Sequence, residues 1–191
     1  KKAGIEIGDI VVITGCLSKK LEKFCQELDV KTLFNPFYDV SGMAASLWTA
    51  KEELKEGFLF LYSDILFDSA IVQELLAGQG DIRLAIKKDG LRQEAEKVIE
   101  DRGIIKSISK DELGKENSEF IGLAKFSNIG AEKTIKELAN MLKENLNVSF
   151  INIINTLVQR GEPVAACDIK NACFIDIDFP EDLKRAAELF A

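Results

Sequence analysis

Short apolar runs and segments with helical spacing alternate along most of this chain. A continuous apolar or β-branched run is typical of a strand that is buried on both faces. Segments whose apolar residues recur every three or four positions are typical of helices with one buried face. The pattern predicts strands at 10–14, 31–34 and 58–62, and helices at 18–28, 41–54 and 69–76.

The middle of the chain follows a different pattern. Two strand-like segments, 97–100 and 104–108, flank the turn Asp101-Arg102-Gly103 and predict a hairpin, so antiparallel pairing is expected here. Other segments again read as single strands or helices. Strands are predicted at 83–87, 120–126, 164–169 and 172–177, and helices at 130–146, 149–160 and 180–190.

The alternation of strands and helices along the chain predicts a sheet whose strands are joined by right-handed crossovers. The expected fold class is therefore α/β, with a Rossmann-like mixed, mostly parallel sheet flanked by helices. A length of 191 residues is enough for one substantial core, so we expect a single domain over 1–191.

Composition narrows the function classes. The net charge of −7, from 25 basic and 32 acidic side chains, argues against nucleic-acid binding, which needs a basic face. No apolar run is long enough to span a bilayer, and no secretory signal is visible. The four cysteines lack CxxC spacing, which predicts reduced thiols and a cytoplasmic protein. Because histidine is absent, His-dependent triads and HExxH zinc sites are excluded.

Carboxylates stand at the ends of two predicted strands. Asp64 follows the strand 58–62, where open α/β sheets place ligands and where a carboxylate can hold the Mg²⁺ of a nucleotide. Near the end of the chain, Asp176 and Asp178 would point to one face, roughly 6–7 Å apart along the strand, and would repel unless a cation joined them. The alternatives are a turn residue for Asp64 and a helix-opening residue for Asp178.

Cations and small residues complete the candidate chemistry. Lys97, Lys110 and Lys125 lie in or beside the middle strands, and a phosphoryl or nucleotidyl transfer site needs such charges. Their ordinary explanation is exposed surface lysine. The small-residue loop SGMAASL (41–47) would let a flat ring lie against the backbone, and close helix packing is its alternative reading.

Five segments in order resemble the sugar-phosphate nucleotidyltransferase superfamily, most of all the phosphocholine and inositol-phosphate cytidylyltransferases. The resemblance covers nearly the whole chain and implies a fold of the nucleotide-diphospho-sugar transferase type. The segments are KKAGIEIGDIVVITGC, NPFYDVSGMAASLWTAKEEL, FLFLYSDILFD, EFIGLAKFSNIGA and FIDIDFPEDLKRA.

The resemblance also implies roles for single residues. Asp64 matches the first magnesium-binding Asp of the family and Asp178 the second, with Asp176 at the adjacent acidic position. Lys110 falls where the family places a lysine against the acceptor phosphate, and Lys97 occupies another family lysine position. The remaining expected residues bind the nucleotide (Ser41, Gly42, Ala45, Ser46) or the acceptor substrate (Lys125, Phe120, Asn152).

Two departures from the family pattern matter. The Gly-rich GxGxRL…PK segment that grips the triphosphate is absent, so we expect a fragment or a trimmed start, and a protein that truly began at Lys1 would be inactive. Ile151 and Asn152 are neutral where relatives often carry acidic residues, which disfavours an amine or quaternary-ammonium acceptor.

The expected function is a magnesium-dependent nucleotidyltransferase that joins CMP from CTP to a small phosphorylated alcohol and releases pyrophosphate. The alternatives are a hexose-1-phosphate uridylyl- or guanylyltransferase, and a non-catalytic nucleotide-binding regulatory domain. The sequence leaves open the acceptor alcohol, a homo-oligomer and a fused partner domain.

Overall fold

The computed structural model describes residues 5–89 and 91–190. The first four residues of the opening family-like segment lie outside the described residues. The described chain divides into two compact units, one of residues up to Phe58 plus Asn128–Gly161, the other of Leu59–Ser127 plus the residues from Glu162 onward. The expected single-domain organisation stays a prediction.

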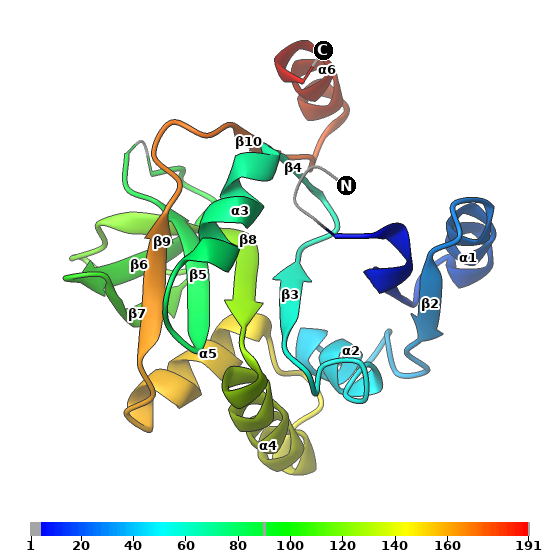
Figure 1. The fold of residues 1–191 in the computed structure, drawn as a ribbon, viewed down its shortest axis with the longest axis horizontal. Coiled ribbons are helices and arrows are strands. Elements are labelled where there is room, and N and C mark those ends of the chain that lie inside the picture. Colours follow the sequence, from blue (N-terminus) through cyan, green and yellow to red (C-terminus); the bar gives the residue numbers. More distant parts are fainter. Residues whose placement is uncertain (1–4, 90, 191) are drawn as a thin grey trace. The chain divides into compact units, whose positions relative to one another are not determined.

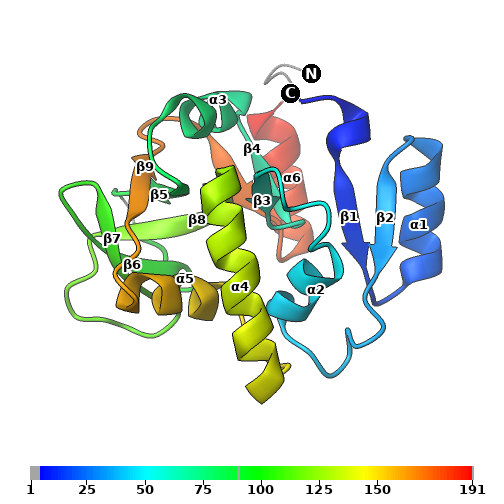
Figure 2. The same ribbon diagram turned by 60° about the horizontal axis from the view of Figure 1, so that its bottom comes forward.

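The first unit combines a small parallel sheet with helices. Strand β1 (Val11–Thr14) pairs in parallel with β2 (Lys31–Phe34), joined by α1 (Ser18–Glu27), and the pair is visible beside α1 in Figure 2. A short 3-10 helix (Ile7–Asp9) precedes β1. The other helices of this unit are α2 (Met43–Thr49), α4 (Asn128–Glu144) and α5 (Phe150–Gln159).

Helix α2 is shorter than the predicted 41–54 segment. Its N-cap is Gly42, and the residues after Thr49 form turns rather than another helical turn. A Cβ on Gly42 would lie 2.4 Å from the carbonyl oxygen of Val148, so only glycine allows this close approach. The N–H of Gly42 donates to the carbonyl of Leu146 at 2.9 Å, which fixes the loop ahead of α2 to the segment ahead of α5.

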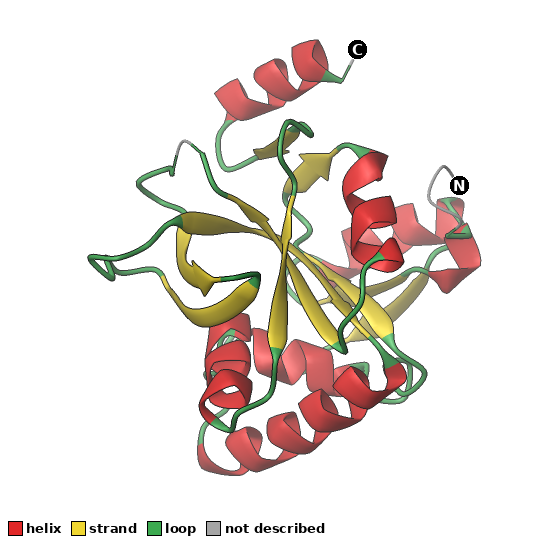
Figure 3. Cartoon of the chain, turned by 60° about the vertical axis from the view of Figure 1, so that its left-hand side comes forward, coloured by secondary structure: helices red, strands yellow, loops and turns green. Residues whose placement is uncertain are grey.

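The second unit is built on a six-stranded mixed sheet of order β3-β8-β5-β9-β7-β6, in which β8 also pairs with β6 (Figures 1 and 3). A separate two-stranded pair joins β4 and β10, and helices α3 and α6 complete the unit. The strands are β3 (Phe58–Leu61), β4 (Ile65–Phe67), β5 (Ile82–Lys87), β6 (Glu96–Asp101), β7 (Ile104–Ser109), β8 (Ser118–Phe126), β9 (Val164–Asp168) and β10 (Phe174–Asp176); the helices are α3 (Ser69–Ala77) and α6 (Pro180–Leu189).

The mixed α/β class is confirmed, but the expected excess of parallel pairing is not. Strand β5 runs parallel to β9 and antiparallel to β8, and β6–β7, β6–β8 and β4–β10 are antiparallel. Antiparallel pairing, which the sequence predicted only for the middle segment, therefore extends to more strands of the sheet than expected.

The core of the second unit lies along β5 and β8. Nearly every position of both strands is buried, as expected for strands covered on both faces, and Leu84, Ile86 and Ala124 are fully buried. Helix α3 contacts both strands and contributes Leu75, also fully buried. This rigid centre supports the polar segments at the strand ends. No helix in the described ranges is long and apolar enough to cross a membrane.

Candidate active site

Two distant parts of the sequence meet where β3 ends. Strand β4 pairs antiparallel with β10, with Ile65 opposite Asp176, and the N–H of Ile177 donates to the carbonyl of Asp64 at 2.7 Å. The side chains of Asp64 and Asp178 are exposed, and that of Asp176 is half-buried. The ladder thus brings the segments that carry all three predicted carboxylates to one end of the β4–β10 pair.

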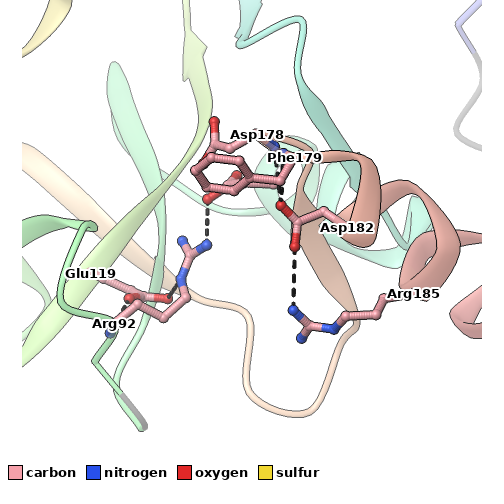
Figure 4. A network of polar contacts seen from close by, with 7 residues as sticks. Arg92, Glu119, Asp178, Phe179, Asp182 and Arg185 are labelled. Atoms are coloured by element: carbon pink, nitrogen blue, oxygen red, sulfur yellow. Dashed lines mark hydrogen bonds and ion pairs between the residues drawn. The ribbon is translucent and has the colours of Figure 1, made fainter.

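The start of α6 is capped by a residue other than Asp178. The acid that caps the start of α6 is Asp182, whose Oδ2 accepts from the N–H of Phe179 at 3.0 Å and of Asp178 at 3.3 Å (Figure 4). The helix-opening alternative for Asp178 therefore applies to Asp182 instead.

The electrostatics of Asp176 reflect its neighbours. Burial raises the pKa of Asp176, and the negative charges of Asp64 and Asp178 raise it further, whereas the Arg92 guanidinium acts in the opposite direction. Carboxylates that repel in this way favour a cation.

The donor set suits magnesium brought in with a nucleotide. Among residues 5–89 and 91–190, no three Asp, Glu, Cys or His side chains gather closely enough to hold an ion by themselves. Mg²⁺ commonly takes only one or two protein carboxylates, with waters and substrate phosphates as its other ligands. Asp64 and Asp178 would supply such ligands, and the ion stays a prediction.

Arg92, which the sequence reading missed, links Asp176 to the sheet. Its main-chain N–H and its Nε donate to the two carboxylate oxygens of Glu119, at 2.9 and 3.1 Å, and its Nη1 donates to Oδ2 of Asp176. Figure 4 shows Arg92 against Glu119. The guanidinium also lies over the ring of Phe174, 4.9 Å from its centroid. The available signal was Glu119, a charged residue directly before the apolar run Phe120–Ala124 of strand β8.

A pocket of about 260 Å³ opens beside this network. It is slightly smaller than typical small-molecule pockets, which measure about 300–1,000 Å³. It is lined by Arg92, Gln93, Glu94, Ala95, Asp176 and Asp178. A wider hollow of about 700 Å³ in the first unit, bordered by Lys19, Glu22 and Lys31 among others, contains none of the predicted site residues.

Glu96 and Tyr62 form a second polar contact that the sequence reading missed. The Tyr62 hydroxyl donates to the Glu96 carboxylate at 3.0 Å, and the Tyr62 ring packs edge-on against Phe60 and Phe120. Phe120, predicted to touch the acceptor, is 3% exposed and lies in contact with Tyr62. The structure therefore gives Phe120 a packing role.

The predicted lysines have different surroundings. Lys97 is 8% exposed, and its Nζ donates to the carbonyls of Gln93 at 2.9 Å and of Lys110 at 3.3 Å. A buried ammonium needs such partners, so Lys97 ties two loops together rather than presenting its charge to a phosphate. The side chain of Lys110 is exposed, and that of Lys125 on β8 is half-buried opposite Arg83.

The predicted nucleotide loop belongs to the first unit. The N–H groups of Gly42 and Ala44 donate to the carbonyls of Leu146 and Val148, and Ala45 is buried. The close-packing alternative therefore accounts for Gly42 and Ala45. Ser41 and Ser46 are half-buried, and both hydroxyls accept from Nδ2 of Asn35, at 3.3 and 3.2 Å.

Asn35 is a buried organiser of this loop that the sequence reading passed over. It is 1% exposed, and its Oδ1 accepts from the N–H of Phe37 at 2.9 Å. The aromatic side chains of Phe37 and Tyr38 that follow are exposed. The Asn-Pro break in the sequence was a signal for this turn, but not for the contacts with the two serines.

Asn152, the third predicted acceptor residue, lies at the start of α5. Its Oδ1 accepts from the N–H of Ser149 at 3.1 Å and from the Ser149 hydroxyl at 2.7 Å, while Ser149 Oγ accepts from the N–H of Asn152. This reciprocal capping box explains the residue without any substrate.

The half-buried carboxylate of Glu96 should make stability depend on pH. Burial raises its pKa, and the Tyr62 hydrogen bond and the charge of Lys110 oppose that rise. As pH increases, Glu96 ionises in the unfolded chain before it ionises in the folded one, so stability is lost through the interval up to the raised folded pKa. A Glu96→Gln variant does not titrate and avoids this loss.

We therefore expect the free energy of unfolding of Glu96→Gln, relative to the unmodified protein, to increase between about pH 3.5 and about pH 7. Urea unfolding of both proteins at the two pH values measures the difference. If the difference between the two proteins stays constant or decreases with pH, the pKa of Glu96 is not raised in the folded protein.

The chain is similar to known proteins in sequence and in fold. No family model matches the chain. A curated relative, the bifunctional IPC transferase and DIPP synthase of Rubrobacter xylanophilus, is 24% identical over 196 residues, covering 99% of this chain and 43% of that protein. The chain thus spans less than half the length of that relative.

Solved structures share the fold. The inositol-1-phosphate CTP transferase from T. maritima superposes with a TM-score of 0.78 at 23% identity, over 94% of this chain and 74% of that one. The CTP:phosphocholine cytidylyltransferase from Streptococcus pneumoniae gives 0.67 at 19% identity, over 100% and 81%. A protein assigned as a glucose-1-phosphate thymidylyltransferase from Bacillus anthracis gives 0.72 at 16% identity, over 94% and 75%.

These relatives differ in the base and the acceptor that their names state, so the shared architecture does not select either substrate. The fold is nevertheless shared with all three structures, which are named as a CTP transferase, a cytidylyltransferase and a thymidylyltransferase. The resemblance to nucleotidyltransferases seen in the ordered segments of the sequence therefore agrees with the curated relative and with the shared fold.

Proposed function

We propose that this chain is the nucleotidyltransferase part of a magnesium-dependent cytidylyltransferase. An oxygen of the acceptor's phosphate attacks the α-phosphorus of CTP, a new P–O bond forms, and the bond to the β-phosphate breaks to release pyrophosphate. The product is a CDP-linked alcohol. No covalent enzyme intermediate is required, because positioning and charge neutralisation supply most of the catalysis in transfers of this kind.

One observation carries the proposal. The ends of β3 and β10 meet through the Asp64–Ile177 backbone contact, beside a small pocket that contains Asp176, Asp178 and the guanidinium of Arg92. Phosphate groups need cations on one side and a carboxylate-held metal on the other, and this pocket has both kinds of side chain within one unit.

Each residue has a proposed task. Asp64 and Asp178, with Asp176 as a third, supporting carboxylate, would hold the magnesium ion, which when bound neutralises charge on the triphosphate. Asp176 shapes the negative end of the pocket, and Lys110, exposed at the end of β7, neutralises the acceptor phosphate. In the first unit, Ser41 and Ser46, whose hydroxyls accept from Asn35, are the residues that we propose to contact the base.

CTP and a phosphorylated polyol such as inositol 1-phosphate are the substrates we propose. The names of the curated relative and of a solved neighbour, an IPC transferase and an inositol-1-phosphate CTP transferase, support this choice. Ile151 and Asn152 are neutral at positions where the resembling family often carries acidic residues, which supports a polyol over an ammonium head group.

The test is a substrate panel with the full-length protein. CTP, UTP and GTP are each combined with inositol 1-phosphate, phosphocholine, 2-aminoethylphosphonate or glucose 1-phosphate, and pyrophosphate release is measured. Preference for CTP with inositol 1-phosphate is the expected result. Preference for an amine substrate would overturn the proposal of a polyol acceptor. Preference for UTP or GTP would overturn the proposal of CTP as the nucleotide. Absence of turnover with every pair would favour a regulatory domain.

Lys110→Ala should lower kcat/KM for the acceptor by about tenfold to a hundredfold, the usual cost of removing a hydrogen bond to a charged group. The unfolding temperature should stay nearly constant, because only the main-chain carbonyl of Lys110 is bonded to Lys97. Steady-state kinetics with varied acceptor measure the effect, with Lys115→Ala on the neighbouring loop as control. Equal kinetics for the two variants would remove Lys110 from the site.

A further inference from the structure

We propose that Arg92 and Glu119 form a support that orients Asp176 beside the metal–nucleotide site, which makes Arg92 a positioning residue. This inference rests on the proposed function, because it assigns to Arg92 a purpose within that same pocket. The observation behind it is a continuous chain of contacts from the centre of the sheet to the pocket.

The chain of contacts begins at Glu119 on β8. This carboxylate is 1% exposed, and both of its oxygens accept hydrogen bonds from Arg92, one from the main chain and one from Nε. A buried carboxylate is costly unless it is paired in this complete way. Glu119 therefore fixes both the backbone and the side chain of Arg92.

Arg92 is also held at its far end. Its guanidinium lies over the Phe174 ring, on the same short strand as Asp176, while Nη1 donates to Oδ2 of Asp176. A planar guanidinium can stack on a ring and bind two carboxylates at once, which lysine cannot do. The geometry leaves the second oxygen of Asp176 without a bond to Arg92.

The position of Arg92 in the pocket indicates that its contacts serve the site and not only the stability of the fold. Arg92, Asp176 and Asp178 line the same pocket, and Asp64 and Asp178 both act on Asp176 as like charges. Arg92 opposes that repulsion. Partners of this kind, one step removed from a metal ligand, typically contribute tenfold to a hundredfold in metal affinity.

The test measures binding, separately from activity. Mn²⁺ replaces Mg²⁺ as an EPR probe, and its affinity for the full-length protein is titrated in the presence of CTP. Arg92→Lys keeps the positive charge but cannot span both carboxylates, and Glu119→Gln weakens the anchor of Arg92. Arg102→Lys, on the exposed turn of the β6–β7 hairpin, is the matched control. CTP binding in EDTA and the unfolding temperature are measured for each variant.

The expected result is a loss of about tenfold in Mn²⁺ affinity for both Arg92→Lys and Glu119→Gln, with CTP binding in EDTA unchanged. The double variant should lose little more than either single one, because the two residues act through one chain of contacts. Arg92→Gln, which has a neutral side chain, serves if Glu119→Gln does not fold.

Two results would overturn the inference. The first is a Mn²⁺ affinity of Arg92→Lys and Glu119→Gln equal to that of the unmodified protein. The second is a loss of CTP binding in EDTA that parallels a lower unfolding temperature. Either result would show that Arg92 has only a structural role. A failure of the proposed function looks different: the unmodified protein would bind no Mn²⁺ with CTP, or Asp64→Asn would leave that binding unchanged.

Discussion

Asp64→Asn in the full-length protein is expected to lower kcat by about a hundredfold or more while leaving the unfolding temperature almost unchanged. The side chain of Asp64 is exposed, and its main-chain carbonyl, which survives the substitution, makes the contact with Ile177. The substitution removes stabilisation of the charge that develops in the transition state, and removal of a single such group typically lowers kcat by about a hundredfold to a thousandfold.

Steady-state turnover with saturating CTP, together with thermal unfolding, measures both parts of this prediction. Asp111→Asn, an exposed acid in the loop after β7, is the matched control and should behave like the unmodified protein. Turnover of Asp64→Asn within about threefold of the control would contradict a metal-binding role. A large drop in unfolding temperature would instead favour the turn-residue alternative for Asp64.

Gly122→Ala should lower the free energy of unfolding by about 2–4 kcal/mol, from backbone strain and overpacking together. Gly122 lies inside β8 with φ of +80°, and a Cβ there would be 2.8 Å from Cδ2 of Tyr62 and 3.2 Å from Cδ1 of Ile65. The carbonyl of the same residue accepts the N–H of Tyr62 at 3.0 Å, so the substitution also disturbs the residues leading to Asp64.

Gly103→Ala separates the two contributions. Gly103 has nearly the same φ, +81°, but a Cβ added there would have no atom within 4 Å, so only the strain of about 1–2 kcal/mol applies. Urea unfolding of both variants provides the comparison. Equal losses at the two positions would mean that the contact between Gly122 and Tyr62 is unimportant for stability.

Much of the fold follows from the pattern of the sequence. Strand β2 has the predicted bounds, and the hairpin around Asp101-Arg102-Gly103 forms as expected, because local rules of period and turn chemistry decide these elements. The segment 65–67 lies between a predicted strand and a predicted helix, yet it forms β4, because its pairing partner β10 lies near the far end of the chain. Long-range pairing of this kind leaves no local signal.

The candidate site was predictable only in part. Asp64, Asp176 and Asp178 stand out because they interrupt or end apolar runs. Lys97 and Asn152 have the right chemistry in the sequence, yet the structure engages Lys97 with carbonyls and Asn152 with a helix cap. Tertiary contacts decide whether the hydrogen-bonding groups of a polar side chain are already paired within the protein, and the sequence does not show these contacts.

Arg92 illustrates the converse. Nothing in its loop sequence indicates a role, and it gains one only because Glu119 on β8 and Asp176 on β10 reach it from distant segments. Ion pairs between distant segments are therefore the part of this site for which the structure was needed.

The central claim is most directly tested by ³¹P NMR of the full-length protein with CTP, inositol 1-phosphate and Mg²⁺. The account predicts stoichiometric appearance of pyrophosphate and a CDP-linked diester, and their absence both in EDTA and with Asp64→Asn. Hydrolysis of CTP without a diester product, or product formation that persists without a divalent cation, would contradict it.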